Sequence, residues 1–376
     1  MPVNKTKAGG FKTGMMFKAE NLLRENIRSL VARSSAREAF KGEAELFMDA
    51  NENPSTPLRP SSVQALGMTT AINRYPDPLQ VELKEKLSKI KGVPAGNIFL
   101  GNGSEEVIDL LYRSFCNPGT DNVIIVTPSR GMYATRANIN DVEVRAVSLT
   151  KEFQLDAERI SEAVDEHTKL LLICSPNNPT GNSMDREDVE FILNNFEGIV
   201  VIDEAYINYS RQRSCISELT EYPNLVVVQT LSHAWGLAGA RIGMAYASDD
   251  IIGILNKVKL AYNIGSPVQA LALQALENIQ QVNESIRMTV QERGKLTAAL
   301  GQLPFVKKIY PSDANFLLVR LNDAKAVYAH LVQHGVVVCD VSEKEMCEEC
   351  LRITVGREEE NERLLSVLAK FNRNAD

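Results

Sequence analysis

The sequence predicts an α/β protein with a mostly parallel seven-stranded sheet in a large domain and a smaller α+β C-terminal domain. Three observations lead to this prediction. Short apolar runs of strand length alternate with helical stretches, as in proteins whose parallel strands are joined by crossover helices. The runs are almost continuously apolar, which is typical of strands buried on both faces. The length of 376 residues suits one large domain with a smaller one beside it.

The seven predicted strands lie in the middle of the chain. They span residues 98–100, 123–126, 144–149, 169–174, 199–202, 225–229 and 241–245. Most of the intervals carry a helical pattern of apolar residues, for example at 105–115 and 186–194. We therefore expect helices on both faces of this sheet.

The C-terminal third has a different pattern, which begins near Gly265, Ser266 and Pro267. A long, charged helical stretch over about 268–300 comes first. Two predicted strands and two predicted helices follow, at 316–320, 351–355, 324–334 and 358–371. We therefore expect an N-terminal arm at residues 1–50, a large domain at 51–265 and a small domain at 266–376.

Composition narrows the possible function classes. The net charge is −7 and no block of lysine and arginine offsets it, which argues against nucleic acid as a partner. Apolar runs are too short to cross a bilayer, and residues 1–14 lack the apolar core of a secretory signal. The six cysteines have no framework spacing, so we expect a cytoplasmic protein.

Polar and glycine-containing segments follow the predicted strands repeatedly. In open α/β sheets, ligands bind at the carboxyl ends of the strands, so this placement predicts a binding site there. Four such segments stand out, at residues 101–106, 175–181, 203–206 and 232–241.

Each segment has a structural explanation beside the functional one. Gly103 and Ser104 suit an anion at a helix N-terminus, or a tight turn from strand to helix. Asp203 at the end of a buried strand suits a cationic partner, or a helix N-cap. Arg241 suits a phosphate, or a salt bridge at the surface.

Together these segments resemble the histidinol-phosphate aminotransferase family. The resemblance extends over nearly the whole chain after about residue 20. It also includes Asn51-Glu52-Asn53-Pro54, Asn73-Arg74-Tyr75-Pro76-Asp77 and Cys350-Leu351-Arg352-Ile353-Thr354-Val355-Gly356. The resemblance implies a fold-type I transferase that uses pyridoxal 5'-phosphate (PLP). The implied parent reaction exchanges an amino group between L-histidinol phosphate and 2-oxoglutarate, in histidine biosynthesis.

The resemblance also implies roles for individual residues. Asp203 would face the pyridine nitrogen, while Asn178 and Tyr206 would bond the ring oxygen. Tyr75 would reach the cofactor phosphate of the other subunit, so a homodimer is implied. The full set of implied cofactor-binding residues is Gly103, Ser104, Glu105, Arg130, Asn178, Asp203, Tyr206, Ser232, Arg241 and Tyr75. The implied substrate-side residues are Asn53, Arg33, Cys339 and Arg352.

Four positions depart from the family's pattern. The family's motif reads Ser-Lys-Ala-aromatic, whereas this chain has Ser232-His233-Ala234-Trp235. That lysine forms the imine with PLP and moves the proton, and an imidazole forms no stable imine. Arg130 and Arg33 stand where tyrosines are expected, and Cys339 stands where an arginine is expected. All four positions belong to one pocket, which indicates a disabled or repurposed site.

Several alternatives remain open from sequence. His233 acts as an acid or base beside a loosely held cofactor, or it only fills the lysine's space. The protein is a poor transaminase that binds PLP weakly and without a covalent bond, or a non-catalytic binding protein for PLP or an anionic phosphorylated metabolite. A related decarboxylase of phosphorylated amino acids needs the same lysine. Cys347 and Cys350 form a C-x-x-C, but no second cysteine pair accompanies them, so we expect no metal site.

Overall fold

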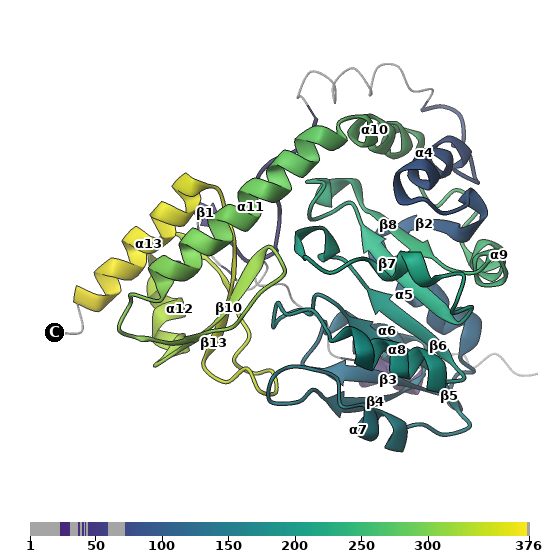
Figure 1. The fold of residues 1–376 in the computed structure, drawn as a ribbon, viewed down its shortest axis with the longest axis horizontal. Helices are drawn as coiled ribbons and strands as arrows, with labels where there is room; N and C mark the ends of the chain where they lie inside the picture. The colour runs from purple at the N-terminus through teal and green to yellow at the C-terminus, as the bar shows by residue number, and fades with distance from the viewer. Residues whose placement is uncertain are drawn as a thin grey trace, which may run out of the picture.

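The computed structural model describes residues 23–30, 37, 40, 42, 44–58 and 72–373. Figure 1 shows a larger body around one sheet and a smaller body built from the C-terminal part, with one long helix running along both. Arg33, one of the expected site residues, lies outside the described residues.

The larger body contains a seven-stranded sheet with the order β2-β8-β7-β6-β5-β3-β4. Its strands are β2 (Ile98–Asn102), β3 (Asn122–Thr127), β4 (Glu143–Ser148), β5 (Thr168–Cys174), β6 (Ile199–Asp203), β7 (Leu225–Thr230) and β8 (Ile242–Tyr246). Strand β8 is antiparallel to both of its neighbours, β2 and β7, and the other neighbouring pairs of this sheet are parallel. The predicted mostly parallel, seven-stranded sheet is therefore confirmed, except that Arg241 stands just before β8 rather than in it.

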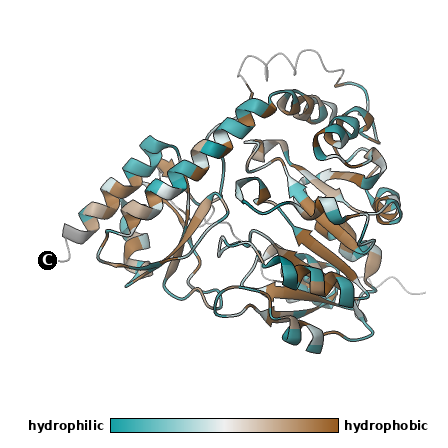
Figure 2. Cartoon of the chain, viewed as in Figure 1, coloured by the Kyte–Doolittle hydropathy of each residue, from teal (hydrophilic) through white to brown (hydrophobic). Residues whose placement is uncertain are grey.

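Apolar residues cover both faces of this sheet, as the continuous apolar runs predicted. In β5, Leu171 and Ile173 belong to one core cluster, whereas Leu170 and Leu172 belong to another. The two clusters lie on opposite faces because successive side chains of a strand point to opposite sides. Figure 2 shows the strands of this sheet as predominantly hydrophobic.

Two sets of helices complete these clusters. One face packs against α5 (Gly103–Phe115), α6 (Met132–Ile139) and α9 (Asp249–Val258). The opposite face packs against α4 (Val81–Lys91), α7 (Ala157–Glu162), α8 (Arg186–Asn195) and α10 (Ser266–Glu277). The short helix α1 (Glu25–Arg28) lies against α6.

The smaller body is an antiparallel sheet covered by helices, as expected for an α+β unit. Its strands have the order β12-β13-β10-β9 and span β9 (Val306–Ile309), β10 (Phe316–Leu321), β12 (Cys339–Asp340) and β13 (Cys350–Thr354). Its helices are α11 (Ile279–Leu300), α12 (Ala324–Gln333) and α13 (Glu358–Arg373). Beside it, β1 (Leu46–Phe47) pairs in parallel with β11 (Val336–Val337).

The stretch over 268–300 is two helices, with Asn278 between α10 and α11. Helix α10 packs against α4 of the larger body (Figure 1), and α11 continues to the smaller one. The boundaries at residues 50 and 265 remain predictions, because the contacts of α10 cross the second of them. Among the described residues, no helix is long and apolar enough to span a membrane.

Candidate active site

The predicted binding edge is a cavity at the carboxyl ends of the parallel strands. Segments after β2, β3 and β7 meet there, together with residues near β1. The cavity has a volume of about 360 Å³ and is lined by Ala50, Glu52, Ser104, Glu105, Arg130, Thr230, Ser232, His233, Ala238, Gly239 and Arg241. Six of these residues are among the expected site residues, so the fold brings them together as the strand-end rule predicts.

One end of the cavity is formed by the N-terminus of α5 pressed against β8. The Gly103 amide donates a hydrogen bond of 2.9 Å to the carbonyl oxygen of Arg241. A Cβ atom at Gly103, whose φ is +75°, would lie 2.5 Å from Nη2 of Arg241. A Cβ atom at Gly243 would lie 2.2 Å from the Ser104 amide nitrogen. Gly103 favours glycine because of its positive φ, and Gly243 favours glycine because a side chain would collide with the backbone of α5.

The polar groups at this end have capacity for an anion. Ser104 is only 7% exposed, and its hydroxyl bonds to no residue in the described part of the chain. Arg241 has a left-handed backbone with φ 55°, and among the described residues its guanidinium bonds only the Ala238 carbonyl, at 3.4 Å. No carboxylate among the described residues pairs with Arg241. A buried hydroxyl, a free guanidinium and a helix N-terminus form a suitable phosphate site.

Ser232 closes this end from the turn after β7. Its amide donates to Oγ1 of Thr230 at 3.1 Å, and the two hydroxyl oxygens are 2.9 Å apart. Thr230 lines the cavity but was not among the expected residues. Thr230 directly follows the predicted strand at 225–229 and stands two residues before Ser232, so the sequence could have indicated it. Glu105 also lines the cavity, and its Oε1 lies 3.8 Å from Nη2 of Arg136.

Asp203 does not itself line the cavity but pairs with Arg130, which does, and it is 1% exposed. Its Oδ2 accepts hydrogen bonds from Nη1 of Arg130 at 2.8 Å and from the Tyr133 hydroxyl at 2.6 Å. Its Oδ1 accepts from the Ala205 amide at 3.0 Å. The carboxylate is thus held by an ion pair and a local turn rather than by capping a helix.

Burial and nearby charges shift the pKa values of Arg130 and Tyr133, the two side chains that donate to Asp203. Burial is the largest single cause and lowers the pKa of Arg130, but the nearby acidic groups, Asp203 first among them, together outweigh burial and hold this pKa well above its usual value. Burial, and then the Asp203 charge, raise the pKa of Tyr133 far above the usual range. Tyr133 therefore stays protonated and donates to Asp203, and Arg130 remains a cation beside the same carboxylate. Sequence reasoning missed Tyr133, although it stands three residues after Arg130.

A second hydrogen-bonded chain crosses the site toward the smaller body. Nδ2 of Asn178 donates to the Tyr206 hydroxyl at 2.9 Å, and Nδ2 of Asn51 donates to it at 3.1 Å. Nη1 of Arg352 donates to Oδ1 of Asn178 at 2.8 Å, and its Nη2 bonds the Asp49 carbonyl. Asn178, Tyr206 and Arg352, three of the expected site residues, are therefore adjacent. Asn51 was missed, although it opens one of the resembling motifs.

His233 lies between these two groups of residues. Its ring stacks on Tyr206 with centroids 4.5 Å apart and an interplanar angle of 22°. Nδ1 is 2.8 Å from the Asn51 carbonyl oxygen, which only accepts, so Nδ1 carries the proton. Burial and then the charge of Arg130 lower the pKa of His233 to about 4. The imidazole is therefore neutral near pH 7, with the lone pair on Nε2.

The remaining expected residues lie around the cavity rather than in it. Nδ2 of Asn53 donates to the Ala234 carbonyl and to Oγ of Ser285, both at 3.1 Å, and Asn53 lines an adjoining cavity of about 310 Å³. Cys339 pairs with Arg352 across β12 and β13, so it lies next to that arginine. Tyr75 is 80% exposed and stacks on Tyr262, with centroids 4.3 Å apart.

The loop between β12 and β13 attaches the smaller body to this edge of the large sheet. Nζ of Lys344 donates to the Ser129 carbonyl at 2.9 Å, next to Arg130. Glu345 accepts from the hydroxyls of Thr127 at 3.0 Å and Ser148 at 2.6 Å. Lys344 is thus an amine near the site that the sequence pattern did not indicate.

The same loop carries the C-x-x-C. Cys347 and Cys350 are buried free thiols. In the described part of the chain, no three metal-ligating side chains gather in one place.

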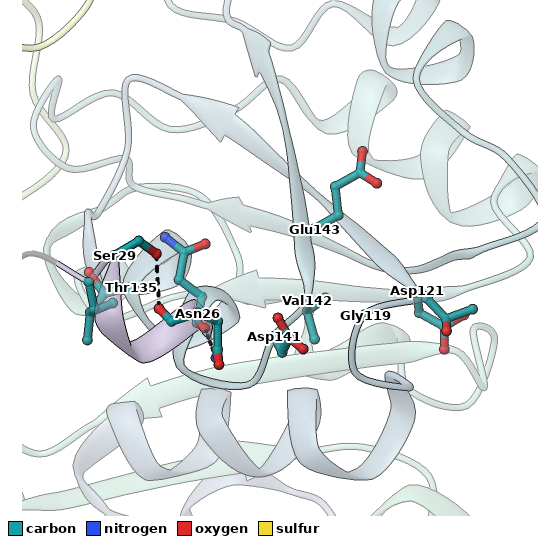
Figure 3. Close-up of a pocket in the computed structure, with 11 residues that line it drawn as sticks. Asn26, Ser29, Gly119, Asp121, Thr135, Asp141, Val142 and Glu143 are labelled. Carbon is teal, nitrogen blue, oxygen red and sulfur yellow. Dashed lines mark hydrogen bonds between the residues drawn. The ribbon is translucent and has the colours of Figure 1, made fainter. Parts of the chain in front are cut away.

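A larger hollow of about 540 Å³ lies at the other edge of the sheet, near the amino ends of β3 and β4. Figure 3 shows acidic side chains around it, including Asp121, Asp141 and Glu143. Among the described residues, no lysine or arginine lines it, so they supply no counter-charge for a phosphate there.

Comparison with known proteins agrees with this architecture. Residues 46–368 match the family described as "Aminotransferase class I and II". The histidinol-phosphate aminotransferase of Parabacteroides distasonis is 49% identical over 349 residues, which cover 93% of this chain and 97% of the relative. The chain belongs to the histidinol-phosphate aminotransferase family. The enzyme of the same name from Cytophaga hutchinsonii is 48% identical over 357 residues, or 95% of this chain and 100% of the relative.

Solved structures share the fold-type I architecture. The histidinol-phosphate aminotransferase of Sinorhizobium meliloti, solved in complex with pyridoxal-5'-phosphate, has a TM-score of 0.82 at 22% identity. The alignment covers 94% of this chain and 98% of that one. L-threonine-O-3-phosphate decarboxylase from Porphyromonas gingivalis has a TM-score of 0.75, also at 22% identity, and covers 87% of this chain and 99% of that one. At these identities, the likeness concerns the fold alone.

Members of this aminotransferase family depend on PLP, and the residues of this chain suit only part of that cofactor. The phosphate end fits, because Ser104, Ser232, Arg241 and the N-terminus of α5 converge there. The end facing the ring does not fit, because Arg130 already pairs with Asp203. Among the described residues, no lysine lines the cavity.

Proposed function

We propose that this chain keeps the histidinol-phosphate aminotransferase scaffold but does not transaminate efficiently. The parent reaction would convert L-histidinol phosphate and 2-oxoglutarate into imidazole acetol phosphate and glutamate. The observation that carries the proposal is the neutral imidazole of His233, which follows Ser232 where the family's pattern has lysine. An imidazole forms no stable imine with an aldehyde, so the covalent anchor of the cofactor is lost.

The position of His233 supports the interpretation that it fills space rather than replaces the lysine as a base. Its Nδ1 is engaged by the Asn51 carbonyl and its ring lies against Tyr206. With a pKa of about 4, it is a weak base at neutral pH. We therefore expect PLP to bind weakly and reversibly, and we expect any turnover to be slow.

The substrate side of the proposal rests on Arg352 and its neighbours. Arg352 would bind the carboxylate of glutamate or the phosphate of the amino alcohol. Cys339 beside it supplies no charge, so one expected contact with substrate phosphate is missing. Asn53 would line the substrate side from the adjoining cavity.

We also propose a cytoplasmic homodimer in which Tyr75 is shared between subunits. Ile72, Tyr75, Leu260 and Tyr262 are large apolar side chains that are highly exposed in the single chain. Exposed side chains of this kind are typical of surfaces that are covered in an assembly. The oligomeric state is measured directly by light scattering.

A second candidate function is a non-catalytic binding protein for PLP or an anionic phosphorylated metabolite. The unpaired guanidinium of Arg241 and the free hydroxyl of Ser104 favour it, because a phosphate-binding end needs no lysine. A phosphate-containing ligand that stabilises the protein without PLP would support this function.

An absorption spectrum with added PLP, before and after borohydride reduction and followed by intact mass, tests the main proposal. We expect no internal-aldimine band and no mass fixed by reduction. A fixed cofactor mass together with normal turnover would contradict the proposal. The variant Lys344→Ala then tests whether that amine is Lys344, because its Nζ bonds the carbonyl of Ser129, the residue before the cavity-lining Arg130.

The variant His233→Lys sharpens the test. We expect it to restore imine formation but not the full rate, because Arg130 and Cys339 still depart from the family's pattern. Adding Arg130→Tyr and Cys339→Arg should raise the rate further. A rate typical of the family from the single reversal would show that the other departures matter little.

A further inference from the structure

Asp203 has little capacity left for another cation. Two donors, from Arg130 and Tyr133, occupy its Oδ2. The Ala205 amide occupies its Oδ1. A carboxylate offers about four acceptor positions, so three of them are taken by this chain's own groups.

Arg130 places a permanent positive charge at this end of the cavity. Its side chain lines the cavity and forms the only ion pair of Asp203 among the described residues. A ligand with a protonated ring nitrogen would bring a second cation beside Arg130 while competing for the same carboxylate. Like charges at such short range in a buried site are strongly unfavourable.

The phosphate end has the opposite property. Ser104 and Ser232 are more than nine-tenths buried, and Arg241 has no acidic partner in the described part of the chain. The hydroxyl of Ser104 is free to donate into the cavity. A phosphate there would gain a guanidinium, a hydroxyl and the N-terminus of α5, which has 13 residues.

We infer that the cavity is selective for phosphate monoesters whose remaining part carries no positive charge, because Arg130 takes the place of a pyridinium as the partner of Asp203. This inference deepens the second proposed function and rests on it. A pyridine ring enters only with its nitrogen unprotonated. PLP with a protonated nitrogen is then a poor ligand for a reason separate from the missing lysine.

The titratable groups that face Arg130 are Asp203, Tyr133, Cys174, Tyr206 and His233. Burial raises the pKa of Cys174 to about 12, and Tyr133 is also shifted upward, so both stay protonated. His233 stays neutral at any pH clearly above 4. Between that pH and neutral pH, Tyr133, Cys174 and His233 therefore add no change of charge beside Arg130.

Two matched probes test the inference. Benzyl phosphate and 3-pyridylmethyl phosphate differ only in one ring nitrogen, and neither contains an aldehyde. Their affinities are measured by calorimetry at one pH above and one pH below the pKa of the pyridine nitrogen. The phosphate titrates in both probes, so the ratio of the two affinities isolates the ring nitrogen.

For the protein itself, we expect the two probes to bind within about threefold of each other at the higher pH. At the lower pH, the pyridyl probe should bind at least about tenfold more weakly than benzyl phosphate. Tighter binding of the pyridyl probe at the lower pH, an unchanged ratio, or no binding of benzyl phosphate would each overturn the inference.

Arg130→Tyr should reverse the ratio, because Asp203 then becomes free to pair with a pyridinium. Arg159→Tyr, at an exposed arginine that pairs with Asp156, is the matched control and should leave the ratio unchanged. If Arg130→Tyr does not fold, the ratio of the two probe affinities for the unaltered protein still tests the inference. Since neither probe forms an imine, a covalent cofactor found in the borohydride experiment would contradict the proposed loss of transamination without affecting this result.

Discussion

The two ends of the cavity differ in what determines them. The phosphate end depends on backbone, because Gly103 and Gly243 allow α5 and β8 to approach within van der Waals distance. The opposite end depends on side chains, because residue 130 decides whether Asp203 has a cationic partner beside its bonds from Tyr133 and the Ala205 amide. A single substitution therefore changes the chemistry of the ring-facing end, whereas the phosphate end persists as long as the fold does.

The largest expected effect is at the ring-facing end. Arg130→Leu leaves the Asp203 carboxylate buried without its cation, so the free energy of unfolding should fall by about 3–5 kcal/mol. The double variant Arg130→Leu/Asp203→Asn removes both charges and should recover most of this loss. Urea denaturation measures both. A loss below about 1 kcal/mol for the single variant would mean that this pair is not a buried ion pair.

A smaller effect is expected at the phosphate end. Gly243→Ala places a methyl group 2.2 Å from the Ser104 amide nitrogen, so it should cost about 2–3 kcal/mol and weaken binding of benzyl phosphate. Gly253→Ala in α9 is the control, because nothing lies within 4 Å of its added methyl group. Equal stability of the two variants would contradict the close approach of α5 and β8.

The smallest expected effect concerns His233. Its pKa is about 4 when folded and 6.5 in the ordinary state, so the unfolded chain binds more protons between these values. Stability should therefore fall as the pH drops from about 6.5 toward 4. His233→Gln should remove roughly 2 kcal/mol of this loss between pH 7 and pH 4.5. Identical pH profiles for the two proteins would show that His233 titrates normally.

The strands were predictable because each is a short apolar run bounded by polar residues. All seven lie where the pattern indicated, and so does the helix after Gly103. The break at Asn278 was not predictable, because neither glycine nor proline marks it and both flanking stretches are good helices. The residues that follow the strands were expected to lie together, because ligands of open α/β sheets bind at the carboxyl ends of the strands. That expectation requires no knowledge of distances.

By itself, the sequence determined the fold class, the family and the identities of His233, Arg130 and Cys339 as departures from the family's pattern. Only the tertiary structure decided which groups those residues meet. Arg130 and Asp203 are 73 residues apart in the chain, and His233 and Asn51 are 182 apart. Local patterns carry no information about such pairs. Their contacts arise only when β3, β6 and β7 align in one sheet and the segment after β1 folds across its edge.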